Sequence, residues 1–159
     1  MSDLPKVEPK CQAQFNMAVM QLKAHEDKTG RENRILLGAS LGGITSVHIA
    51  LKHSDKFAKI GGQSVSWWVD NERVVKELEK LDGKTSFKFY VNDGTLEGVE
   101  DSRKTVEILK KKGFSVVYKE SEAGHNWTAW RDRLADAFMA LMTACVNGLL
   151  SVDNKELVA

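Results

Sequence analysis

Residues 34–43 have the sequence RILLGASLGG, and this stretch decides the fold. Residues 35–37 form a short apolar run that ends at a glycine, which is typical of a strand buried on both faces. From residue 41 to residue 53, apolar side chains recur at the spacing of a helix. A buried strand that turns directly into a helix indicates a parallel sheet covered by helices.

The same alternation continues along the chain. Further strands are predicted over residues 59–65, 86–91 and 114–119, and further helices over residues 11–25, 70–81, 99–112 and 127 to about 150. Strand and helix alternate four times, which predicts an α/β fold with about four parallel strands and helices on both faces. No linker or internal repeat divides the sequence, so residues 1–159 are expected to form a single domain.

Composition excludes several classes of protein. The 23 basic and 22 acidic residues are well mixed, so neither a nucleic acid nor a membrane surface is an expected partner. Apolar runs are shorter than the ~20 residues that span a bilayer, and the first ten residues lack the apolar region of a signal peptide. Cys11 and Cys145 have neither metal-binding nor disulfide-framework spacing. A cytoplasmic protein without a metal site is expected.

Residues 38–42, Gly-Ala-Ser-Leu-Gly, match the G-x-S-x-G pattern of a nucleophile elbow. Such a pentapeptide also occurs by chance, in tight structural turns or in phosphate-binding loops. Its position between a buried strand and a helix favours the elbow, with Ser40 as the candidate nucleophile. The backbone N–H of Leu41, at the start of the helix, is the candidate oxyanion donor.

His125 is the best candidate for a general base among the four histidines. It follows the last predicted strand and precedes the last helix, whereas His25, His48 and His53 belong to helices. Loops at the carboxyl ends of parallel strands lie at one edge of the sheet, where sites are assembled. A loop histidine that only caps the helix is the alternative.

Two segments together carry a resemblance to a known family. Residues 37–43 (LGASLGG) and 124–131 (GHNWTAWR), supported by residues 63–68 and 94–97, resemble esterases related to enterochelin esterases and feruloyl esterases. The resemblance runs from about residue 34 to residue 134. It implies an α/β-hydrolase fold and hydrolysis of a small carboxylic ester through an acyl-enzyme, with Ser40 as nucleophile, His125 as base and no cofactor.

The carboxylate that would orient His125 is harder to choose. The loop after the third strand contains Asp93, Glu97, Glu100 and Asp101. In the resembling family the acid follows a Gly-Thr pair by two positions, which implies Glu97 here. Asp93 is nearer the strand end and is its strongest rival, while Asp101 is expected to cap the following helix.

Tryptophans are expected to line the substrate site. Trp67 and Trp68 follow the second strand, and an aromatic rim there suits a ring-bearing acyl group. At least one of the two is expected to pack in the core. Trp127 is a further lining candidate, and Trp130, three residues later, is expected to be structural.

The sequence departs from the family pattern before Arg34. Family members carry several strands before the nucleophile strand, whereas only 33 residues precede Arg34 here, so a shortened fold without the usual second oxyanion donor is expected. The nucleophile strand would then lie at an unprotected edge, which predicts a homodimer. Two other functions remain open: acyl transfer to an alcohol on the same residues, and a non-catalytic binding or assembly protein.

Overall fold

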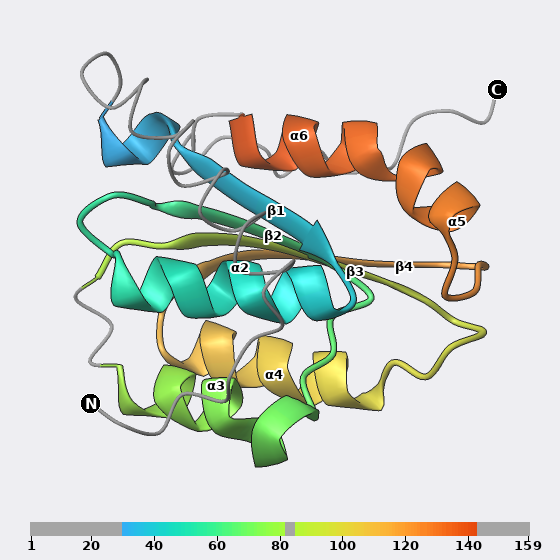
Figure 1. The fold of residues 1–159 in the computed structure, drawn as a ribbon, viewed down its shortest axis with the longest axis horizontal. Coiled ribbons are helices and arrows are strands. Elements are labelled where there is room, and N and C mark those ends of the chain that lie inside the picture. The colour runs from blue at the N-terminus through green and yellow to red at the C-terminus, as the bar shows by residue number, and fades with distance from the viewer. Residues whose placement is uncertain (1–29, 82–84, 143–159) are drawn as a thin grey trace, which may run out of the picture.

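The computed structural model describes residues 30–81 and 85–142 (Figure 1). Their elements, in chain order, are η1 (Arg31–Asn33), β1 (Ile35–Ala39), α2 (Leu41–Lys52), β2 (Lys59–Gln63), α3 (Val69–Lys80), β3 (Lys88–Gly94), α4 (Glu100–Lys111), β4 (Ser115–Ser121), α5 (Trp127–Asp132) and α6 (Leu134–Met142). The predicted alternation of strand and helix is confirmed. The helix predicted over residues 11–25 and both cysteines lie outside the described residues.

The four strands form one parallel sheet in the order β1-β2-β3-β4. Every crossover therefore steps in the same direction, and right-handed crossovers of that kind place their helices on one face. Figure 1 shows α2, α3 and α4 on that face, with α5 and α6 on the opposite side of the sheet. The prediction of helices on both faces is confirmed.

The core has two parts of unequal size. The larger part, which includes Ile60, Phe89 and Leu109, packs between the sheet and the helices α2–α4. On the opposite face, Leu141 of α6 packs with the buried ring of Tyr90. Gly61 permits the close approach of α6, because a side chain there would collide with Leu37 and would lie 3.0 Å from Leu141.

Strand register brings the carboxyl ends of all four strands into one row. Gln63 at the end of β2 is paired with Ala39 of β1 on one side and with Asn92 of β3 on the other. Asn92 is in turn paired with Lys119 of β4. The turns that follow β1, β2, β3 and β4 therefore meet at one edge of the sheet.

Two predicted helices differ from the structure. The final helix is interrupted at Arg133, whose buried guanidinium donates from Nε to the carbonyl of Ala129 and from Nη1 to Ser121 Oγ. In α3, predicted over residues 70–81, Asp70 has a φ of 52° and pairs with Arg73. None of the helices within residues 30–81 and 85–142 is long and apolar enough to cross a bilayer.

The turn between β1 and α2 is tight at two of its three glycines. A side chain at Gly38 would collide with the carbonyl group of Gly42, and one at Gly43 would lie 2.9 Å from Val65 Cγ2. Gly42, by contrast, has open space around the position of a Cβ atom. Packing therefore requires Gly38, the glycine of the motif before the serine. It does not require Gly42, the glycine of the motif after the serine.

Gly38→Ala is expected to lower the free energy of unfolding by about 1–3 kcal/mol, because the added methyl group meets backbone atoms that cannot rotate away. Gly42→Ala is the matched control and is expected to raise it by about 0.5–1 kcal/mol, since alanine is the better helix former. Urea unfolding followed by circular dichroism measures both values. Equal losses in the two variants would contradict the difference in space between them.

Candidate active site

Ser40 occupies a strained turn at the end of β1. Its φ of 53° and ψ of −120° lie outside the regions that non-glycine residues normally adopt. Two backbone hydrogen bonds join it to the end of β2 and the turn that follows: its N–H donates to the carbonyl of Gln63 at 2.8 Å, and its carbonyl accepts from the N–H of Ser66 at 3.3 Å. The serine thus sits at the N-terminus of α2 in the geometry of a nucleophile elbow.

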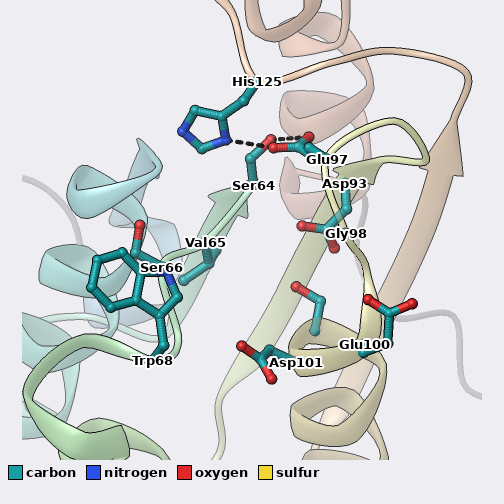
Figure 2. A pocket seen from close by; sticks show the side chains of 11 residues that line it. Ser64, Val65, Ser66, Trp68, Asp93, Glu97, Gly98, Glu100, Asp101 and His125 are labelled. Atoms are coloured by element: carbon teal, nitrogen blue, oxygen red, sulfur yellow. Dashed lines mark hydrogen bonds and ion pairs between the residues drawn. The ribbon is translucent and has the colours of Figure 1, made fainter.

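His125 connects this serine to a carboxylate from a third loop. Its Nε2 lies 2.9 Å from Ser40 Oγ, and its Nδ1 lies 2.5 Å from Glu97 Oε2. The three side chains come from the turns after β1, β4 and β3. Figure 2 shows His125 reaching across to Glu97, with Ser64 beside the carboxylate.

The ionisation of Glu97 follows from its contacts. Burial raises the pKa of Glu97, but hydrogen bonds from Ser64, His125 and the N–H of Gly94 outweigh burial and hold the pKa below its usual value. The side chain is therefore a carboxylate at neutral pH and can only accept hydrogen bonds. Nδ1 of His125 must then carry the proton, which leaves Nε2 free to accept from the hydroxyl of Ser40.

The loops that carry Glu97 and His125 are joined through their backbones. The N–H of Thr95 donates to the carbonyl of Ser121 at 2.9 Å, and that of Leu96 donates to the carbonyl of Ala123 at 3.1 Å. Gly94 is packed so closely against Ala123 that any side chain there would collide with its carbonyl oxygen. The separation of the carboxylate and the imidazole is thereby fixed by main-chain contacts.

Ser64 and Trp130 support the site and were not predicted to take part in it. The buried hydroxyl of Ser64 donates to Glu97 Oε1 at 2.6 Å and accepts from Trp130 Nε1 at 3.0 Å. The ring of Trp130 also meets that of His125 edge to face, with centroids 5.0 Å apart. Ser64 directly follows β2, as Ser40 follows β1, and that shared position was the available signal in the sequence.

Asp93, the rival acid, points elsewhere. It is 3% exposed, and Figure 2 shows its carboxylate directed away from His125 into a cavity. Burial, with a smaller contribution from the negative charge of Glu97, raises the pKa of Asp93 to about 6, against the neighbouring hydroxyls of Ser102 and Tyr118, which lower it. Glu97, and not Asp93, is the carboxylate that hydrogen-bonds His125.

The three tryptophans predicted to contact substrate have different positions. Trp67 is 1% exposed and donates from Nε1 to Ser102 Oγ at 2.9 Å, so it packs in the core, as expected of at least one of the pair, and does not line the site. Trp68 is 65% exposed and lines the cavity that contains Asp93. Trp127 is exposed and lines a second cavity with Trp130.

Two cavities flank the Ser40–His125 pair. The smaller, of about 220 Å³, lies on the side of Asp93 and includes His125 in its wall. The larger, of about 500 Å³, is lined by Gly38 and Ala39 of the elbow and by apolar side chains of α5. Leu41 is the first residue of α2, where a backbone N–H has no acceptor within the helix, so this donor remains available beside Ser40.

Comparison with known proteins gives the family. The family model Esterase, described as "Putative esterase", matches residues 17–141. The chain is 33% identical over 94 residues to "Uncharacterized protein YbbA" of Bacillus subtilis (strain 168), a match that covers 53% of this chain and 37% of that protein.

Solved structures share the fold. The enterobactin esterase FES from Shigella flexneri superimposes with a TM-score of 0.63 at 21% identity, over 84% of this chain and 40% of that chain. A ferulic acid esterase superimposes with a TM-score of 0.68 at 16% identity, over 87% of this chain and 62% of that chain. The chain therefore spans less than half the length of the Bacillus protein and of the enterobactin esterase. Because the family model covers most of the sequence, the chain belongs to the Esterase family, and the predicted resemblance to enterochelin and feruloyl esterases is confirmed.

Proposed function

We propose that this chain hydrolyses a carboxylic ester through an acyl-enzyme, with Ser40, His125 and Glu97 as its triad. The observation that carries the proposal is the unbroken hydrogen-bond chain from Ser40 Oγ to His125 Nε2, at 2.9 Å, and from His125 Nδ1 to Glu97. A serine hydroxyl is a weak nucleophile until an adjacent base can take its proton. This arrangement supplies that base in the required tautomer.

In the first half of the reaction, Ser40 Oγ attacks the ester carbonyl carbon while its proton passes to His125 Nε2. The carbonyl oxygen gains the negative charge, which the N–H of Leu41 and the N-terminus of α2 stabilise. The bond to the leaving oxygen then breaks, and His125 returns the proton to that oxygen. An alcohol departs and the acyl group remains on Ser40.

In the second half, water takes the place of the alcohol. His125 accepts a proton from the water as its oxygen attacks the acyl carbon, and then protonates Ser40 Oγ as the acid leaves. Glu97 keeps the imidazole oriented and stabilises its protonated form without itself taking the proton. The side chain of His125 is 46% exposed, so water can reach it, and this favours hydrolysis over acyl transfer to a second alcohol.

A non-catalytic binding protein is disfavoured by the strain at Ser40. A serine held at a φ of 53° costs of order 1–3 kcal/mol, and such strain persists at positions where a site requires it. A binding surface alone would not require a hydroxyl aligned with an imidazole and a carboxylate.

Ser40 and His125 are expected to act as a unit. Ser40→Ala and His125→Ala should each lower kcat for p-nitrophenyl esters by about 10⁴–10⁶, and the double variant should be little worse, because the effects of triad residues are not additive. A fluorophosphonate probe should label the native chain and neither variant. Turnover that survives Ser40→Ala would assign the chemistry to another residue.

The assignment of Glu97 as the acid of the triad is tested by comparing the kcat values of three variants on a neutral ester. Glu97→Gln should lower kcat by about 10²–10⁴, since an amide no longer enforces the tautomer of His125. Ser64→Ala should lower kcat by about tenfold with little change in KM, because Glu97 loses one of its charge-assisted hydrogen bonds. Asp93→Asn should have a smaller effect than Glu97→Gln. The reverse order would transfer the role to Asp93, and small effects throughout would indicate a Ser–His dyad.

We also propose that two copies of the chain associate along β1. Within residues 30–81 and 85–142, β1 pairs only with β2, so its other edge carries unpaired backbone groups. On the α6 side of the sheet, Trp127, Phe138 and Met142 add exposed apolar surface. A two-fold contact is the commonest way for identical chains to bury such a surface. Sedimentation velocity at micromolar concentration should show a dimer, and an active monomer would contradict the proposal.

A further inference from the structure

The smaller cavity, called here the carboxylate pocket, is lined by acidic side chains from two elements. Asp93 comes from the end of β3, and Glu100 and Asp101 come from the first turn of α4. Glu97 lies at its border with the Ser40–His125 pair. Figure 2 shows these carboxylates around one space, with Trp68 on the opposite wall.

One carboxylate oxygen of Asp93 lacks a hydrogen-bond donor. Oδ2 of this buried side chain has no hydrogen-bond partner in the described part of the chain, and the carboxylate points into the pocket. Leaving a buried carboxylate oxygen unpaired is costly, so such a group calls for a ligand or other donor. This observation is independent of the two exposed acids on α4.

The nearby basic side chains of α4 are engaged outside the pocket. Arg103 forms two hydrogen bonds of 2.7 Å with Glu120, and Lys104 pairs with Glu72 at 3.3 Å. Neither basic residue belongs to the wall of the pocket. Glu100 accepts a hydrogen bond from the N–H of Val99 and so has a structural role as well. Arg133, whose positive charge lowers the pKa of Asp93, also lies outside the wall, so the charged groups of the wall are carboxylates beside the imidazole of His125 and favour a cation.

Trp68 indicates what kind of cation fits. Its indole ring is largely exposed and shares the pocket with the carboxylates. An aromatic ring together with carboxylates binds organic ammonium groups, through the ring face and through charge. A volume of about 220 Å³ accommodates one small group rather than a whole drug-sized ligand.

The pocket adjoins the Ser40–His125 pair. Ser66 forms part of its wall, and Ser66 Oγ lies 3.3 Å from Ser40 Oγ. His125 also forms part of the wall, and in the proposed reaction its Nε2 protonates the departing alcohol oxygen. The alcohol portion of a bound ester would consequently extend towards the carboxylates.

We infer that the carboxylate pocket binds an ammonium group on the alcohol portion of the substrate, so that the chain prefers esters of small amino alcohols. This inference rests on the proposed ester hydrolysis and adds a substrate class to it. Asp101 and Asp93 supply the negative charge, and Trp68 supplies the aromatic wall.

The kinetic test compares acetylcholine with 3,3-dimethylbutyl acetate, which has the same shape but no charge. The native chain should show a kcat/KM at least about tenfold higher for the cationic ester. Asp101→Asn, an exposed substitution that retains a polar group at the helix start, should reduce this ratio about fivefold or more. Glu107→Gln removes an exposed carboxylate of the same helix that pairs with Lys111 outside the pocket, and it should leave the ratio unchanged.

A binding measurement separates the two proposals. Choline chloride titrated into Ser40→Ala should show saturable heat by calorimetry, weakened by Asp101→Asn and absent with sodium chloride at equal ionic strength. If choline binds but neither ester is cleaved, the proposed function fails and the pocket stands. If the neutral ester is cleaved without preference for the cation and choline does not bind, the inference is overturned and the hydrolase stands. Binding of calcium ion in place of choline would also overturn it.

Discussion

In-register pairing of four parallel strands is the constraint on which the rest of the molecule depends. It places Ser40, Ser64, the loop of Glu97 and the loop of His125 side by side, one after each strand. Each group then needs only a short turn to reach its neighbour. The proposed triad is thus assembled from segments distant in sequence without any long structureless loop, and its precision derives from the backbone ladder of the sheet.

The surroundings of two carboxylates four residues apart shift their pKa values in opposite directions. Hydrogen bonds from a serine, a histidine and a backbone N–H hold the pKa of Glu97 low, despite its burial. Asp93 is more deeply buried, which raises its pKa to about 6, and its Oδ2 has no hydrogen-bond partner in the described part of the chain. Two acids whose surroundings separate their pKa values usually have different chemical roles. The surroundings of Glu97 suit a carboxylate that accepts a hydrogen bond from an imidazole. Those of Asp93 suit a carboxylate that binds the proposed ammonium group.

Sequence reasoning identified the sheet, the elbow and His125, because each depends on local pattern or chain order. It could not tell which of Trp67 and Trp68 is buried, since that depends on the direction in which the chain turns after β2. It missed Ser64 and Trp130 because their hydrogen bond joins residues 66 positions apart and exists only once β2 and α5 are in place. The break at Arg133 was equally hidden, as the side chain there hydrogen-bonds Ser121, which lies in a different element. Local rules failed where long-range hydrogen bonds decided the outcome.

The strained turns after β1 and β2 show how the sheet stabilises its site. Ser40 and Ser64 both have positive φ values, 53° and 49°, which neither residue would adopt alone. Each donates its N–H to the last residues of the next strand, Ser40 to the carbonyl of Gln63 at 2.8 Å and Ser64 to that of Asn92 at 2.7 Å. The hydrogen-bond ladder of the sheet thus continues one residue past β1 and one residue past β2. Each added hydrogen bond offsets part of the backbone strain at the serine that makes it. The same kind of backbone hydrogen bond therefore positions both the proposed nucleophile and the hydroxyl that donates to Glu97, so the two ends of the proposed triad are held relative to each other by the sheet.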